Sequence, residues 1–134
     1  MIVVDASALT TALADDGGDG ERVRARLRTQ VLAAPELIDL EVTSVLRRLA
    51  LSGQLPVGRA EQAVSDLAVL PMQRAPHVPL LPRCWSLRDN LSVYDASYVA
   101  LAEALDAPLL TADVRLSRAP GLRCVVEVLR TSAR

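Results

Sequence analysis

The amino-acid sequence predicts an α/β domain in three layers, with a short, mainly parallel central sheet flanked by helices. Short apolar segments alternate along the chain with longer helical ones, beginning with IVVD at 2–5. Because parallel strands need crossover connections, usually helices, this alternation favours parallel pairing. Hydrophobic residues make up 51% of the 134 residues, enough for one sizeable core, and no linker divides them. We therefore expect residues 1–134 to form a single domain.

The first half of the chain supplies the opening strand, four helices and a second strand. A small-residue apolar segment predicts a helix over 6–13, which a run of Asp and Gly ends. A helix over 21–28 has two apolar residues on its inner side, and an apolar run ending in proline predicts a strand at 31–34. Two long amphipathic helices follow, over 36–53, where a glycine ends the helix, and over 56–70, where a proline follows.

The second half of the chain supplies three strands and two helices. A weak strand is expected at 72–75 and, after a proline-rich loop, a helix over 82–89. The segment 92–106 is strongly periodic and predicts a helix, and 107–113 is an apolar strand that runs into a turn. The segment 122–129 supplies the last strand, either as one piece or as two. Ligands of parallel sheets bind beyond the carboxyl ends of the strands, so the residues directly after each strand are candidates for a site.

Charge and composition exclude several classes of protein. The formal net charge is −1 and only Trp85, Tyr94 and Tyr98 are aromatic, so the sequence predicts neither a large basic surface nor stacking platforms for bases. All fifteen basic residues are arginine, which excludes sites that need a lysine ammonium. A single histidine leaves a zinc site without ligands. Without a signal peptide or a long apolar run, we expect a cytoplasmic protein that has no membrane segment.

Two aspartates stand directly after predicted strands. Asp5 follows the first strand and Asp113 the strand at 107–113, so parallel pairing brings both residues to the same edge of the sheet. Asp5 also precedes a helix, where an aspartate N-cap stabilises the helix by about 1 kcal/mol, and Asp113 has the same structural explanation. Each residue alone is therefore weak evidence for a functional site.

Asp95 belongs to a predicted helix and has two interpretations. It stands three residues after Ser92, as in a capping box, which favours a structural role. It also shares a helical face with Val99 and Ala102, which directs its side chain toward the packed side of the helix.

Glu41 is the carboxylate that is hardest to explain by structure alone. In its helix it shares an i,i+4 column with Leu37, Val45 and Leu49, so we expect it among core residues. A buried carboxylate without a partner costs several kcal/mol, so an arginine or a cation has to compensate it. Asp39 lies about 200° around the helix, on the predicted solvent face. Glu41 is therefore a candidate site residue and Asp39 is not.

Carboxylates that converge at one sheet edge repel one another and destabilise the fold unless a cation compensates them. Oxygen ligands without histidine or cysteine favour Mg²⁺ or Mn²⁺. The hydroxyls of Ser7 and Thr111, close by in sequence, can add ligands or orient them. A metal ion held in this way activates a water and neutralises a leaving oxygen, which suits phosphodiester hydrolysis. The predicted metal-binding and catalytic residues are Asp5, Glu41, Asp95 and Asp113.

Four segments occur in the order found in PIN-domain ribonucleases: VVDASAL, PELIDLEVTSVLRR, YDASYVALAEAL and LLTADVRL. The chain resembles this family over essentially its whole length, and it is most similar to the VapC-type toxins of bacterial toxin–antitoxin pairs. The resemblance implies a PIN-like domain with an acidic cluster that binds Mg²⁺ or Mn²⁺, beside two hydroxyls. The residues at these positions are Asp5, Glu41, Asp95 and Asp113 for the acids, and Ser7 and Thr111 for the hydroxyls.

The resemblance also implies an activity and partners. It implies a metal-dependent endoribonuclease that serves as the toxin of a type II toxin–antitoxin system and cleaves an RNA. Such proteins commonly form homodimers and are silenced by a cognate VapB-type antitoxin whose C-terminal segment occupies the active groove. Some PIN nucleases carry a further acid where this chain has Arg115, so a one-metal and a two-metal site both stay open.

Two other functions share part of this sequence pattern. A phosphohydrolase of the haloacid dehalogenase type also begins with a strand that ends in Asp, but it needs a second Asp where this chain has Ser7. The second alternative is a catalytically inert PIN-like binding module. Loss of one of the four acids would favour that alternative, and all four are present.

The arginines have two interpretations. Arg115 and Arg118 follow Asp113 closely and are candidates for contact with RNA or antitoxin. The cluster within 22–28 has two interpretations. It contacts RNA or an antitoxin, or it forms a solvated helix face, which is the usual role of a run of charges. This cluster consists of Arg22, Arg24, Arg26 and Arg28.

Overall fold

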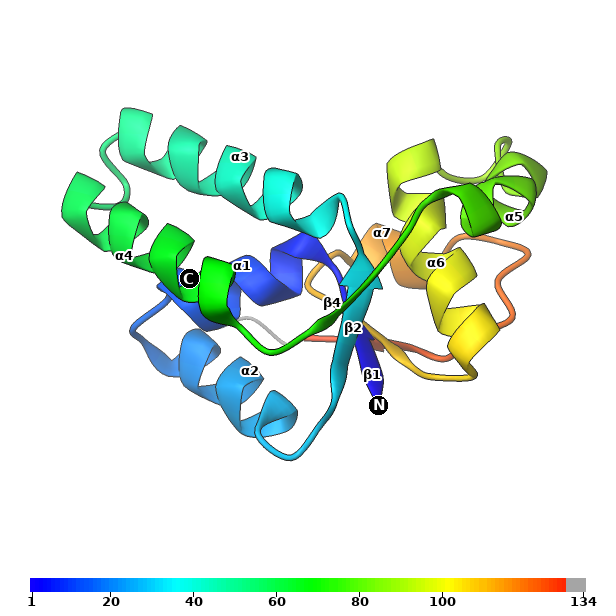
Figure 1. Cartoon of the computed structure of the whole chain (residues 1–134), viewed down its shortest axis with the longest axis horizontal. Coiled ribbons are helices and arrows are strands. Elements are labelled where there is room, and N and C mark those ends of the chain that lie inside the picture. The colour runs from blue at the N-terminus through cyan, green and yellow to red at the C-terminus, as the bar shows by residue number, and fades with distance from the viewer. Residues whose placement is uncertain (130–134) are drawn as a thin grey trace.

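The computed structural model describes residues 1–129, and its centre is one sheet between two groups of helices (Figure 1). The strands are parallel and lie in the order β3-β2-β1-β4-β5. Their bounds are Ile2–Val4 for β1, Leu32–Pro35 for β2, Gln73–Ala75 for β3, Leu109–Thr111 for β4 and Val126–Val128 for β5. The parallel sheet and its two covering layers confirm the predicted three-layer α/β fold.

Every predicted helix is present, within a few residues of its predicted bounds. The helices are α1 (Ala6–Ala14), α2 (Gly18–Leu27), α3 (Ile38–Leu51), α4 (Val57–Val69), α5 (Leu81–Ser86), α6 (Val93–Leu105) and α7 (Val114–Ser117), with a 3₁₀ turn, η1 (Val78–Leu80). The sequence pattern did not predict η1 or α7. Figure 1 shows α1 to α4 gathered on one side of the sheet and α5 and α6 on the other. Within residues 1–129, no helix combines the length and the apolar character that crossing a membrane requires.

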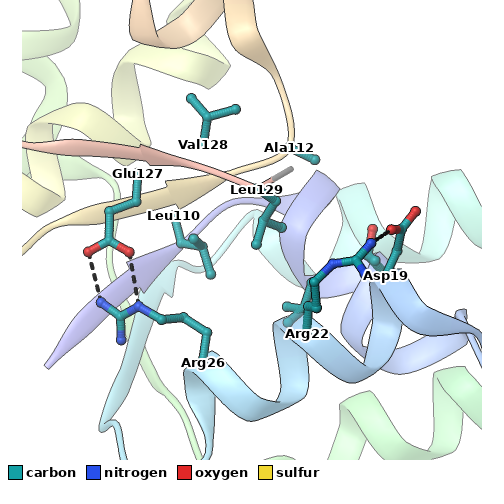
Figure 2. A pocket seen from close by; sticks show the side chains of 10 residues that line it. Asp19, Arg22, Arg26, Leu110, Ala112, Glu127, Val128 and Leu129 are labelled. Atoms are coloured by element: carbon teal, nitrogen blue, oxygen red, sulfur yellow. Dashed lines mark hydrogen bonds and ion pairs between the residues drawn. The ribbon is translucent and has the colours of Figure 1, made fainter. Parts of the chain in front are cut away.

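The helix α2 carries the arginine cluster and packs its apolar side inward. Val23 and Leu27 are buried, as predicted. Figure 2 shows Arg26 reaching Glu127 of β5 beside a cavity of about 310 Å³. The partners within the cluster are Asp19 for Arg22, two backbone carbonyls near the end of α1 for Arg24, and both carboxylate oxygens of Glu127 for Arg26, at 2.9 and 2.8 Å. Three of the four arginines therefore have partners within the chain.

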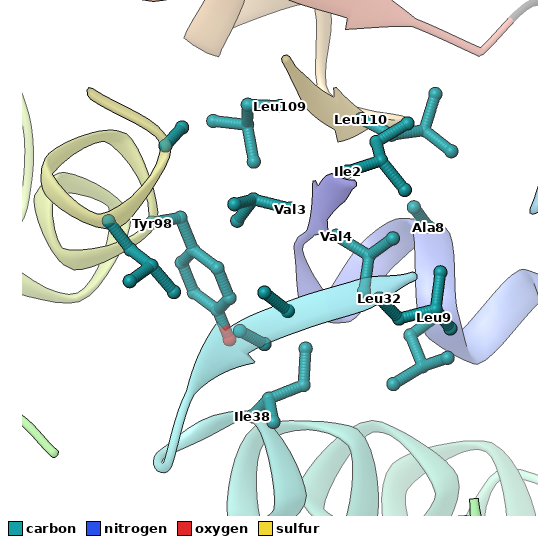
Figure 3. Close-up of a cluster of buried hydrophobic side chains, with 14 of the residues drawn as sticks. Ile2, Val3, Val4, Ala8, Leu9, Leu32, Ile38, Tyr98, Leu109 and Leu110 are labelled. Carbon is teal, nitrogen blue, oxygen red and sulfur yellow. The ribbon is translucent and has the colours of Figure 1, made fainter. Parts of the chain in front are cut away.

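The central strand β1 lies in the middle of the hydrophobic core. All three of its residues, Ile2–Val4, are fully buried. Figure 3 shows Tyr98 of α6, Ile38 of α3 and Leu109 of β4 among the side chains around this strand. Burying a valine or isoleucine side chain stabilises a fold by about 1.5–3 kcal/mol, so β1 is held firmly in place. The residue that follows it is fixed with it.

The register of the two central strands determines what lies at the carboxyl edge of the sheet. Val4 of β1 pairs with Leu110 of β4, and the Asp5 backbone N–H donates to the Leu110 carbonyl at 3.2 Å. The residues that follow this pair, Asp5 and Thr111, are therefore neighbours at that edge.

Candidate active site

Asp5 is the most deeply buried carboxylate at the carboxyl edge. It is 7% exposed and caps the N-terminus of α1, where its Oδ1 accepts the Ala8 N–H at 2.9 Å. Oδ1 also accepts the Ser7 hydroxyl at 2.6 Å, and Oδ2 accepts the Thr111 hydroxyl. Burial raises the pKa of Asp5 even though these hydrogen bonds favour the charged form. Asp5 therefore caps the helix as the sequence predicts, but the capping hydrogen bond engages only one of its two carboxylate oxygens.

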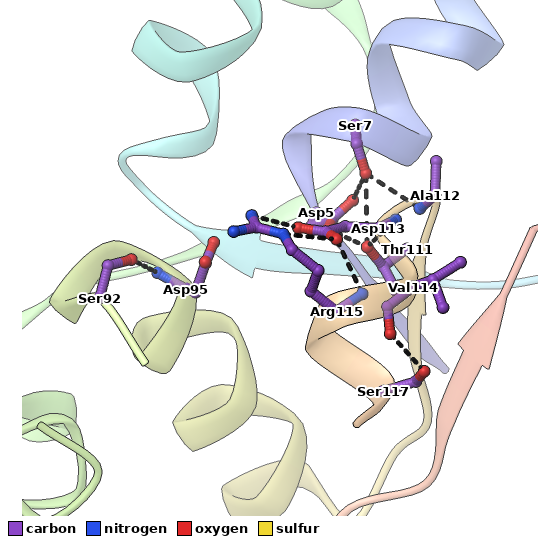
Figure 4. A network of polar contacts seen from close by, with 10 residues as sticks. All are labelled: Asp5, Ser7, Ser92, Asp95, Thr111, Ala112, Asp113, Val114, Arg115 and Ser117. Carbon is purple, nitrogen blue, oxygen red and sulfur yellow. Dashed lines mark hydrogen bonds and ion pairs between the residues drawn. The ribbon is translucent and has the colours of Figure 1, made fainter. Parts of the chain in front are cut away.

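Ser7 and Thr111 tie the ends of β1 and β4 together (Figure 4). The Ser7 hydroxyl accepts the Ala112 N–H at 3.0 Å and lies 3.4 Å from the Thr111 hydroxyl. The Thr111 hydroxyl accepts the Asp113 N–H at 2.9 Å while it donates to Asp5. Both hydroxyls thus orient the Asp5 carboxylate and the backbone that leads to Asp113.

Glu41 has a partner that the sequence interpretation missed. Its Oε1 accepts the Tyr98 phenol at 2.6 Å, and Tyr98 is only 1% exposed. Burial raises the pKa of Glu41, and the nearby charges of Asp95 and Asp5 raise it further. One signal for Tyr98 was present in the sequence, since it stands three residues after Asp95 and therefore on the same side of α6.

The predicted core position of Glu41 is wrong in part. The fully buried residues of α3 are Ile38, Val42 and Leu46. Glu41 and the residues four positions before and after it are only half-buried. They are offset by one residue from the buried set, which places them about 100° around the helix from it. The reason is that α3 packs on α1 and α4, so its core stripe faces those helices and Glu41 lies at the border.

Asp39 lies on the helix face of the exposed Thr43 and Arg47, as predicted, but it is itself only partly exposed. It is half-buried because Arg74 of β3 binds it, with Nε 2.8 Å from Oδ2. Arg74 also donates to the carbonyls of Leu67 and Leu70, at 2.9 and 3.3 Å. Asp39 therefore belongs to a contact between α3 and the end of α4.

Asp95 and Asp113 face a shared cavity at the same edge. Asp95 lies in the first turn of α6, where its N–H donates to the N-cap hydroxyl of Ser92 at 3.1 Å. Asp113 caps α7 and is paired with Arg115, whose Nη2 lies 2.8 Å from Oδ2. The cavity measures about 340 Å³, and its lining includes Asp95, Asp113, Arg115 and Asn90. Polar and charged groups therefore meet in a space that can hold a small polar ligand.

Three of these carboxylates lie where negative charge is unfavourable. Burial raises the pKa values of Asp5, Glu41 and Asp95, and each is raised further by the charge of at least one other acid at this edge. Asp113 is the exception, because hydrogen bonds from Arg115 lower its pKa. An additional positive charge placed among Asp5, Glu41 and Asp95 would therefore be stabilised.

The four carboxylates are the type of ligand that a hard divalent cation prefers, but their side chains do not yet surround one point. Within residues 1–129, no three His, Cys, Asp or Glu side chains lie close enough to enclose one ion. Asp5 is fixed, but Glu41, Asp95 and Asp113 are only half-buried. Carboxylate oxygens are the ligands that Mg²⁺ and Mn²⁺ favour. An ion beside Asp5 would therefore need less buried side chains of this edge to turn toward it.

Two comparisons of sequence bear on this site. The family model described as PIN domain matches residues 2–122. The chain is 46% identical over 129 residues to Ribonuclease VapC1 of Mycobacterium tuberculosis, which covers 96% of this chain and 97% of that protein. It is 45% identical over 129 residues to Ribonuclease VapC9 of the same species, covering 96% and 98%.

Solved structures share the fold at low sequence identity. The crystal structure of Mycobacterium tuberculosis VapC20, a sarcin-ricin loop cleaving toxin, superposes with a TM-score of 0.68 at 14% identity, over 88% of this chain and 94% of that one. The structure of FitAcB from Neisseria gonorrhoeae gives a TM-score of 0.67 at 16% identity, over 94% and 96%. VapBC2 from Rickettsia felis, bound to a DNA fragment from its promoter, gives 0.68 at 14% identity, over 97% and 100%.

Proposed function

Since the chain belongs to the PIN-domain family and to its VapC-type ribonucleases, we propose that it is a Mg²⁺- or Mn²⁺-dependent endoribonuclease. It forms one PIN domain and acts as the toxin of a type II toxin–antitoxin pair in the cytoplasm. Its substrate is RNA, and its reaction is hydrolysis of a phosphodiester bond. The observation that carries this proposal is that Asp5, Glu41 and Asp95 lie near the carboxyl edge of the sheet, where burial and the charge of a neighbouring acid raise the pKa of each.

The ligands that we assign to the metal are Asp5, Glu41, Asp95 and Asp113. Asp5 is the fixed member, because Ser7 and Thr111 hold its two oxygens. When bound, the ion supplies the activation of a water ligand and neutralises the leaving oxygen. The chain's own groups set the positions at which this chemistry takes place.

Glu41 is the residue that we assign to the attacking water. Its Oε1 is held by Tyr98, which leaves Oε2 to accept a hydrogen bond from water or to contact the metal. Its raised pKa makes the carboxylate a better proton acceptor than an exposed glutamate. In the reaction the water gives a proton to Glu41 and its oxygen forms a bond to phosphorus. The bond from phosphorus to one ribose oxygen breaks, and that oxygen takes a proton from solvent as it leaves.

An antitoxin and a second copy of the chain are the proposed protein partners. The antitoxin follows from the VapC-type family and from the likeness to VapBC2 and FitAcB. For the homodimer we propose a face where large apolar side chains are exposed on η1, α5 and α6. These are Val78, Leu81, Trp85, Val93 and Tyr94. Apolar groups that gather at one surface favour association, so light scattering that finds only monomer at micromolar concentration would contradict this face.

Cleavage of total cellular RNA by the purified, antitoxin-free protein tests the nuclease. The reactions contain Mn²⁺, Mg²⁺ or EDTA, beside the variant Asp5→Asn, whose fold is checked by circular dichroism. Discrete fragments that need the metal and vanish in the variant support the proposal. Metal binding without cleavage of any RNA would instead support an inert PIN-like binding module.

A further inference from the structure

Arg115 grips Asp113 with its backbone and its side chain together. The Arg115 N–H donates to Oδ1 of Asp113 at 2.9 Å, Nε donates to Oδ1 at 3.2 Å, and Nη2 donates to Oδ2 at 2.8 Å. Both oxygens of this carboxylate are therefore engaged by one residue. Because two of these bonds come from a charged guanidinium, the carboxylate is already paired with a positive charge, and a metal ion has to compete with it.

The Arg115 grip is exposed and easily broken. The Arg115 side chain is 86% exposed and that of Asp113 is 29% exposed. Ion pairs at such surfaces contribute about 0–1 kcal/mol, because water and salt screen them. The structural pair between Arg83 and Glu103 differs, since its side chains are only 24% and 13% exposed. The grip on Asp113 is therefore suited to release.

The guanidinium of Arg115 also acts on the rest of the site. Its charge lowers the pKa of Asp95, partly offsetting the effects of burial and of Asp113. Figure 4 shows the Arg115 side chain extending from α7 past Asp113 toward the space between Asp5 and Asp95. Arg115 lines the cavity together with Asp95 and Asp113. It is a positive charge that the chain itself supplies at the edge where a divalent cation would be stabilised.

Resting on the proposed function, we propose that Arg115 is an internal counter-ion that competes with the metal for Asp113 and, once released, binds a phosphate of the RNA. The grip neutralises Asp113 in the metal-free protein. The Arg115 guanidinium leaves Asp113 when that carboxylate becomes a metal ligand, and the guanidinium then faces the same cavity. A guanidinium binds a phosphate through two parallel hydrogen bonds, so the released side chain contacts the substrate that the metal also engages.

Arg118 provides a matched control for the counter-ion role of Arg115. It lies three residues later at the end of α7, is exposed and carries the same charge. Its backbone N–H bonds to the Arg115 carbonyl, and no hydrogen bond from its guanidinium to an acid is found within residues 1–129. An effect of net charge alone would appear equally in both variants.

The test measures Mn²⁺ binding without RNA, by the electron paramagnetic resonance signal of free Mn²⁺, and then RNA cleavage at saturating Mn²⁺. Arg115→Ala should bind Mn²⁺ roughly three- to ten-fold more tightly, because a competing pair and a repelling charge are gone. Its KM for RNA should rise about ten-fold, with a smaller change in kcat. Arg115→Lys should bind Mn²⁺ like the wild type but retain a raised KM. Arg118→Ala should leave Mn²⁺ binding unchanged.

Each other outcome has a definite meaning. If the wild type binds Mn²⁺ and Arg115→Ala binds it no more tightly, the counter-ion role is overturned while the proposed nuclease stands. Tighter Mn²⁺ binding with an unchanged KM overturns the phosphate contact. If neither protein binds Mn²⁺, both the inference and the proposed function fail.

Discussion

Replacing Tyr98 with phenylalanine removes one hydroxyl from the core and leaves the ring in place. That hydroxyl donates to Oε1 of Glu41 at 2.6 Å, across the interface between α6 and α3. Tyr98 is 1% exposed, so the phenylalanine ring fills the same space and no cavity is created. The variant therefore isolates the hydrogen bond that orients Glu41.

The magnitude follows from the burial of the two partners. A hydrogen bond to a charged group contributes about 1.5–3 kcal/mol. Because Glu41 is half-buried, water replaces part of the lost bond, and we expect the free energy of unfolding to fall by about 1–2 kcal/mol. Loss of a group that orients a metal ligand typically costs about 10- to 100-fold in affinity or activity. Cleavage should therefore fall by at least about ten-fold.

Urea denaturation at pH 7 measures the first effect, and the initial rate of RNA cleavage at saturating Mn²⁺ measures the second. With a slope of about 1.5 kcal/mol/M, the midpoint should move by about 1 M. Tyr94→Phe is the control, because Tyr94 is 65% exposed and its loss of a hydroxyl should change stability by less than about 0.5 kcal/mol. A Tyr98→Phe protein as stable and as active as Tyr94→Phe would refute this role of the phenol.

Three further predictions concern the acids. Glu41→Gln should abolish metal-dependent cleavage, whereas Asp39→Asn should leave it nearly intact, because Asp39 is bound by Arg74 instead of facing the site. Saturating Mg²⁺ or Mn²⁺ should raise Tm, since binding at about 100 times Kd stabilises a fold by about 2.7 kcal/mol. Burial raises the pKa of Glu103, but hydrogen bonds led by Arg83 bring it below the usual value of 4.5. Its stabilising effect is therefore present above about pH 4.5 and fades as the pH falls, so Glu103→Gln should be less stable than wild type at neutral pH and comparable at about pH 3.

Each of these predictions has a result that contradicts it. Equal losses of cleavage in Glu41→Gln and Asp39→Asn would remove the distinction between the two faces of α3. An unchanged Tm in saturating metal would show that the carboxylates do not hold an ion. A deficit of Glu103→Gln that stays constant between pH 7 and about pH 3 would mean that packing, and not charge, stabilises this position.

The sequence was informative wherever a local pattern determines position. The β-branched run before Asp5 predicts a buried strand, and parallel pairing then places that residue at the carboxyl edge beside Thr111. Ser92 and Asp95 show the expected capping contact at the start of α6. These features depend on residues that are close in the chain or on general rules of sheet topology.

Contacts between distant elements were not predictable in the same way. The bond from Tyr98 to Glu41 joins residues 57 positions apart, and it depends on how α6 approaches α3. The pair of Arg74 and Asp39 depends in turn on β3 lying beside the start of α3. Periodicity reports which face of a helix is apolar, but it does not report which neighbour that face meets.

The short helix α7 was missed for a different reason. With four residues, Val114–Ser117, it completes barely one turn and gives no periodic signal. Its formation turns the Arg115 side chain back onto Asp113. The most unusual feature of the site, an arginine bound to a candidate metal ligand, therefore depends on an element that a pattern search cannot detect.

Anomalous diffraction from crystals grown with Mn²⁺ locates the ion itself instead of inferring it from activity. We expect an anomalous peak at the carboxyl edge of the sheet, within coordination distance of Asp5 and of at least two of Glu41, Asp95 and Asp113. We also expect that Arg115 no longer contacts Asp113 in that crystal. A protein that binds Mn²⁺ elsewhere, or shows no peak at this edge at saturating Mn²⁺, would contradict the assignment of these carboxylates as a metal site.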